Sequence, residues 1–492
     1  MPSVQEIRRY MNNMARALQI VEEFPNPFNQ LVTCHGYAEL TRQVRKDLAR
    51  AWKGGLTPFF IYLEQFIEQI FDLPQKEDRY IQATAVVLWM DERLCYSANS
   101  NADRFSLYEL IPLRDNHVLS LGLMNLNGPK TGIAIHPRMS TIKVWDQINN
   151  QARSLSNRDI CGGIRGKLNN ISYTFFDHHL IVHHLIAPFC PTDGLDTLRV
   201  AFCPIADSAN LLKIQNTPII RNGMTLEGIA LEGLRYTKTL EANFRRDWRL
   251  ASSKNAYICF GPEMLLTPAM AEMDGPYNRN MRELCLDAVA DGLSPPQFTV
   301  LPTCWVDGSN TAAIVNQNGR VLGTQPKYIP FVDQGANRVE ALKEVANRHI
   351  YILHIPDVHR IAIMICADFL AIHDVGMSDL LCGQLGVTLI LVPSYSHGEQ
   401  DFVNLLPSLG GYGTTVFWGG CCGAVDAPRI VGACSVAGTD RTFRLGEHRK
   451  CQDCCVPGRS CVYLVDLPLS PQRAKPHPVI WDDPVRHCCL TN

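Results

Sequence analysis

The chain has 492 residues, of which 46% are apolar and 19% are charged, and its formal net charge is −2. This length exceeds what one ordinary hydrophobic core requires, so we expect two domains. The near-neutral charge balance argues against a disordered chain and against a general polyanion binder. The longest apolar runs, 361–365 and 387–393, are strand-sized. They fall far below the roughly 20 residues of a membrane helix, so we expect no membrane association.

The first part of the chain, residues 1–195, is expected to form a domain of mixed helical and β structure whose role the sequence does not identify. Apolar residues at helical spacing predict helices over 5–23, 37–52 and 58–71. Strand-like runs follow over 83–90, 117–124 and 131–136. Two prolines and a glycine make 188–196 the best linker candidate.

Several basic residues give the second predicted helix a charged face: Arg42, Arg45, Lys46, Arg50 and Lys53. Such a face can contact nucleic acid or an acidic protein partner. The solvated side of an ordinary amphipathic helix is the simpler interpretation. A protein or nucleic-acid partner of the N-terminal domain therefore stays an open expectation.

The chain contains 19 cysteines, a high number for its length. A secreted disulfide scaffold is normally short and carries an export signal. Residues 1–10 are charged at Glu6, Arg8 and Arg9, and no apolar segment follows them, so we expect no secretory signal. These features predict a cytoplasmic protein with mostly free thiols.

From residue 198 onward, strands and helices alternate in a regular way. Helices are predicted over 225–250, with Thr225 as its cap, and over 277–290. Strands are predicted over 199–205, 257–260, 311–315, 320–323, 361–365, 388–392, 416–418, 430–435 and 461–465. The Asn318-Gly319 dipeptide is typical of a two-residue hairpin turn. This alternation predicts a layered α+β domain.

Three reactive side chains each come just after a predicted strand: Glu263, Lys327 and Cys366. Strand ends on one edge of a sheet bring together side chains that are distant in sequence, so we expect these three to meet. Glutamate can accept the thiol proton, and the thiolate can attack an electrophilic carbon. Lysine and the backbone N–H of Ala367 can stabilise the resulting oxyanion, and the lysine is also expected to favour the thiolate.

Three segments around these residues resemble motifs of the nitrilase superfamily of carbon–nitrogen hydrolases. Segment 260–263, Phe-Gly-Pro-Glu, resembles the glutamate motif, and 310–331 resembles the hairpin that leads to the catalytic lysine. Segment 360–368, RIAIMICAD, resembles the Cys-x-Asp elbow. The resemblance covers about 198–468. It implies a catalytic Glu263, Lys327 and Cys366, a positioning role for Asp368, and no cofactor.

The resemblance also implies an αββα sandwich over 196–468 and a homo-oligomer, a dimer or larger. The segment 469–492 is then a C-terminal arm that can contact a partner subunit. Many family members have a second glutamate shortly after the lysine. Here the nearest acid is Asp333, so it is the supporting acid that we expect, and its role stays open.

The expected activity is hydrolysis of a small amide or nitrile through an acyl intermediate on Cys366, with transfer of the acyl group to an amine as a variant. Trp305, Tyr395 and His397 follow predicted strand ends and are candidates for the substrate pocket. The alternative is an oligomerising scaffold or effector subunit, for example in a bacterial defence system, where the module occurs fused to nucleic-acid enzymes. That analogy is one of fold only.

Other residues suggest different sites. His373, seven residues after Cys366, offers a Cys–His dyad in place of the lysine-containing site, although a loop histidine is more often solvated. His179 and His183 could bind a metal if they lay on a helix, but the apolar residues between them favour a strand. Cys451, Cys454, Cys455 and Cys461 could hold zinc, although free thiols are the simpler interpretation, and we expect no metal.

Overall fold

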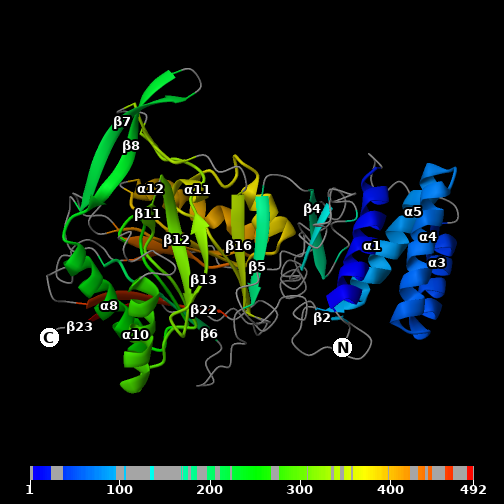
Figure 1. The fold of residues 1–492 in the computed structure, drawn as a ribbon, viewed down its shortest axis with the longest axis horizontal. Helices are drawn as coiled ribbons and strands as arrows, with labels where there is room; N and C mark the ends of the chain where they lie inside the picture. The colour runs from blue at the N-terminus through cyan, green and yellow to red at the C-terminus, as the bar shows by residue number, and fades with distance from the viewer. Residues whose placement is uncertain are drawn as a thin grey trace. The chain divides into compact units, whose positions relative to one another are not determined.

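The computed structural model describes a chain of mixed helices and sheets (Figure 1). The described residues are 4–23, 37–95, 105–106, 133–137, 164, 168, 170–175, 179–185, 197–205, 211–221, 224–266, 276–306, 308–333, 337–343, 348–355, 358–396, 398–421, 430–437, 442–445, 460–468 and 485–490. The chain divides into two compact units, Met1–Leu185 with Gly383–Gly386, and Ile186–Cys382 with Val387–Asn492.

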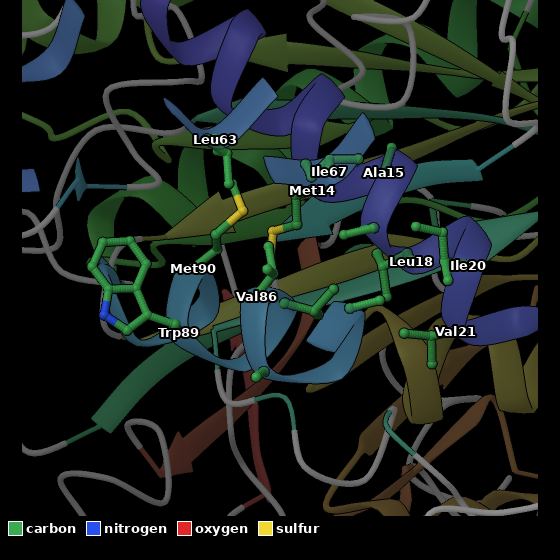
Figure 2. Packing of buried hydrophobic residues seen from close by; sticks show 14 of the residues in the cluster. Met14, Ala15, Leu18, Ile20, Val21, Leu63, Ile67, Val86, Trp89 and Met90 are labelled. Carbon is green, nitrogen blue, oxygen red and sulfur yellow. The ribbon is translucent and has the colours of Figure 1, made fainter. Parts of the chain in front are cut away.

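The first unit is built around a cluster of helices: α1 (Val4–Glu22), α3 (Tyr37–Lys53), α4 (Leu56–Asp72) and α5 (Lys76–Glu92). In α1, apolar residues at intervals of three and four, such as Met14, Leu18 and Val21, form one buried face. Figure 2 shows this face packed against α4 and α5 through Leu63 and Val86. The core of this unit therefore lies between its helices. The helices predicted over 5–23, 37–52 and 58–71 are confirmed as α1, α3 and α4.

Helix α5 corrects one prediction. The sequence pattern favours a strand over 83–90, but these residues are helical. Ala83 to Met90 are buried almost throughout, since the helix contacts both α1 and α3 as well as α4. An apolar run buried on several sides looks the same in a strand and in a helix. Strand β3 (Ile133–Pro137) confirms the run over 131–136 and pairs with β4 (Ile171–Phe175), whereas 117–124 lies outside the described residues.

Helix α3 carries the basic residues noted in the sequence. Val44 and Leu48 on its other side are buried in the core of the unit. Arg45 forms an ion pair with Glu92, and Arg50 lies 3.4 Å from Asp47. Among the described residues, no helix is both long enough and apolar enough to cross a bilayer.

The described part of the second unit contains two large sheets and a smaller one of four strands. The strands of the first are β6 (Thr197–Phe202), β9 (Ile258–Phe260), β10 (Phe298–Val300), β11 (Cys304–Val306), β12 (Ser309–Asn316), β13 (Val321–Pro326), β22 (Ser460–Pro468) and β23 (Val485–Leu490). They are ordered β11-β12-β10-β9-β6-β22-β23, and β13 pairs with β12. Strand β23 comes from the expected C-terminal arm and pairs with β22 of the same chain.

The second sheet has the order β21-β20-β19-β18-β17-β16. Its strands are β16 (Arg348–Ile355), β17 (His359–Ile363), β18 (Leu389–Pro393), β19 (Thr415–Gly419), β20 (Gly432–Ser435) and β21 (Thr442–Leu445). The central strands β17, β18 and β19 are parallel and are buried at every position, which explains their continuous apolar sequences.

Aromatic rings from these two sheets pack against one another. The ring of Phe260 on β9 lies 4.9 Å from that of Phe417 on β19. Gly419 on β19 has no room for a side chain, because a Cβ there would come within 2.4 Å of the Phe202 ring on β6. Helices α8 (Thr237–Ser253) and α10 (Pro276–Ala290) pack on the first sheet, where Trp248 donates a hydrogen bond to Thr299.

A long hairpin corrects the prediction of one helix over 225–250. Strand β8 (Met224–Leu234) pairs along its length with β7 (Leu212–Arg221), and helix α8 begins only at Thr237. A Cβ on Gly228 would come within 2.7 Å of Ile219, so glycine is needed where the two strands meet. Figure 1 shows the hairpin projecting beyond the sheets, and β8 also pairs with β15 (Arg338–Glu340).

Candidate active site

The three residues singled out in the sequence follow the strands as expected. Glu263 comes after β9, Lys327 directly follows β13, and Cys366 lies between β17 and the short helix α11 (Ala367–Leu370). Cys366 has backbone angles φ 48° and ψ −106°, a conformation that residues with a side chain rarely adopt. Such a conformation costs roughly 1–3 kcal/mol and is found mainly where a side chain must be presented to a ligand.

Lys327 lies between two carboxylates. Its Nζ atom is 2.8 Å from Oε1 of Glu263 and 2.6 Å from Oε2 of Glu340. The exposed fractions of Glu263, Lys327 and Glu340 are only 1%, 3% and 4%. Buried charges of this kind are tolerated only when they are paired and hydrogen-bonded. The structure therefore brings together a compact group of one ammonium and two carboxylates.

Burial and neighbouring charges act in opposite directions on Lys327. Burial alone lowers the pKa of its ammonium, but Glu263, Cys366 and Glu340 raise it, and the net pKa lies well above the ordinary value. Burial raises the pKa of Glu340, and the ammonium of Lys327 opposes that shift. Lys327 thus keeps its positive charge at neutral pH, which is the form that can stabilise an oxyanion.

The thiol of Cys366 is buried and accepts a hydrogen bond from Oγ of Ser394 at 3.7 Å. Burial raises the pKa of this thiol, the charge of Glu263 raises it further, and Lys327 lowers it only in part. The sequence led us to expect that Lys327 would favour a thiolate. The opposing effect of burial is larger, so the thiol is protonated at rest and must lose its proton during any reaction.

Asp368 ties the segment after the cysteine to the segment after the lysine. One of its carboxylate oxygens, Oδ1, accepts hydrogen bonds from the backbone N–H groups of Tyr328 at 3.0 Å and Ile329 at 2.7 Å. Burial raises the pKa of Asp368 to about 7, although both hydrogen bonds oppose this shift. Ala367, whose N–H was expected at the oxyanion, is the first residue of α11 and is buried.

Glu340 is the acid that sequence reasoning missed. Asp333, the acid expected to support Lys327, lies partly exposed on β14 (Val332–Asp333), whereas the second carboxylate bonded to Lys327 comes from the end of β15. The backbone N–H of Phe331 also donates to Glu340 at 3.0 Å. A glutamate at the end of a short strand was the only signal in the sequence, and that strand could not be identified without its pairing to β8.

Of the described residues expected to line the substrate pocket, only Tyr395 has a hydrogen bond to the group around Lys327. Tyr395 contributes its backbone N–H, which donates to Oε2 of Glu263 at 2.9 Å. Trp305 is buried on β11, in register with Asn310 of β12. His397 lies outside the described residues.

The alternative Cys–His dyad is not favoured by the contacts of His373. Its two ring nitrogens lie 3.0 Å from Oγ of Ser378 and 2.8 Å from Oγ of Ser408. Both nitrogens are thus occupied by serine hydroxyls. A histidine that served as base for a cysteine would need one nitrogen directed at the sulfur.

Within the described ranges, no group of three or more histidine, cysteine or acidic side chains could hold a metal ion. His179 and His183 lie on β5 (His179–Leu185), a strand as favoured from the sequence, so they lack the helical spacing. Cys451, Cys454 and Cys455 lie outside the described residues, and Cys461 lies on β22.

Comparison with known proteins gave no matching family model and no matching curated protein. Solved structures that resemble the chain include the amidase from Nesterenkonia sp. AN1 in complex with butyramide, with 16% identity, a TM-score of 0.38, and coverage of 55% of this chain and 91% of that chain. Another form of that amidase carries the acetamide moiety of fluoroacetamide, added covalently at its active-site cysteine. It has 15% identity, a TM-score of 0.39, and coverage of 57% and 93%.

A further structure of the same amidase, described as a member of the nitrilase superfamily, has 15% identity and a TM-score of 0.38 and covers 56% of this chain and 94% of that chain. The structural neighbours are therefore nitrilase-superfamily amidases, matched over little more than half of this chain.

Proposed function

We propose that the chain is a carbon–nitrogen hydrolase that cleaves a small amide or nitrile through a covalent intermediate on Cys366. The observation that carries the proposal is the buried Lys327, held between Glu263 and Glu340, in the same site as a cysteine with a strained backbone. A protein needs no such group for packing, because replacing buried ion pairs by apolar residues is often neutral or stabilising. The proposal includes an αββα sandwich over 196–468.

For an amide substrate, Glu263 accepts the proton of the Cys366 thiol while sulfur attacks the carbonyl carbon. The ammonium of Lys327 and the backbone N–H of Ala367 stabilise the oxyanion of the tetrahedral intermediate. The carbon–nitrogen bond then breaks, and the leaving amine takes the proton from Glu263. This step leaves a thioester on Cys366.

Hydrolysis of the thioester completes the cycle. Glu263 accepts a proton from water, the hydroxide attacks the thioester carbon, and a second oxyanion forms in the same place. When the carbon–sulfur bond breaks, the sulfur takes the proton back and the carboxylic acid leaves. An amine in place of water would give acyl transfer by the same steps. No cofactor takes part in either sequence.

The proposal is tested by intact-protein mass spectrometry after brief exposure to small thiol-reactive amides such as iodoacetamide and fluoroacetamide. The wild type should gain one adduct that maps to Cys366, and Lys327→Ala should gain it more slowly. Cys366→Ala should gain none, whereas Cys434→Ala, which removes a buried thiol on β20, should behave as the wild type. Labelling spread over several cysteines and unchanged by Cys366→Ala would overturn the proposal.

A second candidate function is assembly, with the module serving as an oligomerising scaffold. The observation that favours it is the β7–β8 hairpin, on which Ile214 is 52% exposed and Ile220 is 80% exposed. Apolar side chains so exposed on an edge strand are typical of a contact with another chain. The two functions differ in one outcome: a scaffold would keep every cellular function in the Cys366→Ala variant.

A further inference from the structure

Asn310 contacts both carboxylates that flank Lys327. This residue lies on β12, and its side chain is completely buried. Its Nδ2 atom donates to Oε1 of Glu263 at 2.8 Å and to Oε1 of Glu340 at 3.3 Å. An amide nitrogen carries two hydrogens, and the two carboxylates account for both of them.

The orientation of the Asn310 amide is fixed by its neighbours. Thr303 Oγ1 accepts the backbone N–H of Met264 at 2.7 Å. The hydroxyl hydrogen of Thr303 is therefore available for Oδ1 of Asn310, which lies 2.5 Å away. A flipped amide would direct its NH₂ group at this hydroxyl and leave both carboxylates facing an oxygen. Only one orientation of the Asn310 amide is therefore consistent with its neighbours.

The two carboxylates consequently have matching sets of donors. Glu263 and Glu340 each accept from the Lys327 ammonium and from the Asn310 amide. Glu263 also accepts the backbone N–H of Tyr395, and Glu340 accepts that of Phe331. If both carboxylates are ionised, they outnumber the single ammonium by one negative charge in a buried place. A neutral amide can stabilise that charge without adding another, which no acidic or apolar side chain could do.

We infer that Asn310 is a positioning residue that holds Glu263 and Glu340 on either side of Lys327 and keeps Glu263 ready to accept the Cys366 proton. This inference rests on the proposed function. Asn310 acts through the two carboxylates and is not itself a reacting group.

The test measures the rate at which iodoacetamide alkylates Cys366 between pH 5 and pH 9, with the modified residue identified by mass spectrometry. Asn310→Leu removes both hydrogen bonds at similar volume and should slow alkylation roughly 10- to 100-fold, as expected when a hydrogen bond to a charged group is lost. The matched control is Thr311→Val, on the next residue of β12, whose hydroxyl contacts Ser309 instead. It should change the rate by no more than about twofold.

Asn310→Asp provides a readout that packing alone would not produce. At pH 8 this variant places a third carboxylate beside the other two and should react as slowly as Asn310→Leu. At lower pH the new carboxyl becomes protonated and can again donate one hydrogen bond. Its rate relative to the wild type should therefore rise as the pH falls, whereas the relative rate of Asn310→Leu should not.

Failure of the inference is distinct from failure of the proposed function. If Cys366 is labelled in the wild type and Asn310→Leu reacts at the wild-type rate, Asn310 has no positioning role, and the proposed nucleophile stands. If Asn310→Leu does not fold, the Asp variant decides: a relative rate independent of pH would overturn the inference. If the wild type is not labelled at Cys366, the proposed function fails first and the inference fails with it.

Discussion

Asp368 accepts a hydrogen bond of 2.7 Å from the backbone N–H of Ile329. This contact joins the segment that begins at Cys366 to the segment that follows Lys327. The proposed nucleophile and the proposed oxyanion donor come from different sheets, so their separation depends on such a bridge. Burying an ionised carboxylate costs more free energy than burying a neutral side chain. Ionisation of Asp368 should therefore lower the stability of the fold by a measurable amount.

The first prediction concerns the pH dependence of folding. Burial raises the pKa of Asp368 from an ordinary value of 3.8 to about 7. The protonated carboxyl of Asp368 therefore contributes favourably to the free energy of unfolding. This contribution is fully present below pH 3.8 and is lost as the pH rises through about 7. Asp368→Asn keeps an oxygen acceptor but cannot ionise. From pH 4 to pH 8 the wild type should lose stability relative to this variant, by an amount on the order of a few kcal/mol.

The measurement is the thermal unfolding midpoint of both proteins across that pH range. Only the difference between the two proteins is informative, because other groups titrate in both. Asp333→Asn, on the partly exposed β14, serves as a control for the replacement of an aspartate elsewhere in the same unit. A constant difference between wild type and Asp368→Asn from pH 4 to pH 8 would contradict the prediction.

The second prediction concerns Lys327→Met, which removes the ammonium but fills much of its space. Glu263 and Glu340 would then be buried without their shared counter-charge. Loss of one member of a buried ion pair typically costs about 3–5 kcal/mol, and we expect a destabilisation of that size at pH 8. At pH 5 the loss should be smaller, because protonation of a carboxylate relieves the unpaired charge.

Denaturant unfolding at pH 5 and pH 8 measures both effects. Lys254→Met, at an exposed position after α8, is the matched control and should change stability by less than about 0.5 kcal/mol. Equal destabilisation by Lys327→Met at the two pH values would be inconsistent with unpaired carboxylates as the cause.

The third prediction separates Glu340 from Asp333. Glu340→Gln removes a carboxylate bonded to Lys327 but keeps an oxygen acceptor for the N–H of Phe331. Alkylation of Cys366, and turnover once a substrate is found, should fall roughly 10- to 100-fold, as for other lost contacts between charged groups at reacting centres. Asp333→Asn should leave both rates within about twofold. The reverse order would mean that the acid nearest in sequence is the functional one.

The fourth prediction tests the close approach of the two sheets. Gly419→Ala places a methyl group only 2.4 Å from the nearest atom of the Phe202 ring. Both groups are on strands, so neither can move freely, and we expect a destabilisation of about 1–3 kcal/mol. Gly410→Ala is the control, since nothing lies within 4 Å of the place that its methyl group would take. Urea unfolding distinguishes them, and equal midpoints would show that the sheets accommodate the methyl group.

Much of the second unit could be predicted because its strands have local signatures. The buried runs 257–260 and 388–392 correspond closely to β9 and β18. Asn318 and Gly319 lie in the turn between β12 and β13, but this turn is longer than the two residues predicted, because β12 ends at Asn316 and β13 begins at Val321. The positions of Glu263, Lys327 and Cys366 after strands could be predicted in the same way.

Glu340 could not be identified from the sequence, because its position depends on a contact with a distant part of the chain. Its strand β15 has only three residues and is defined by parallel pairing with β8, more than a hundred positions earlier in the chain. We expected 225–250 to be one helix, because Leu226, Ile229 and Ala230 fit helical spacing as well as they fit a strand. The dipeptide Asn222-Gly223, a hairpin signal between two apolar runs, was the feature that could have corrected this.

The β7–β8 hairpin has a consequence for anyone who would shorten or decorate this protein. Because it projects beyond the sheets in Figure 1, it resembles a surface excursion that could be trimmed or used to attach a tag. Yet Ile229 on β8 is the register partner of Glu340, and its carbonyl accepts the N–H of Ala341 at 2.8 Å. Deleting residues 212–234 would thus remove β8, the strand that pairs with β15 and so positions Glu340, and insertions are better tolerated in exposed stretches that pair with no strand of the site.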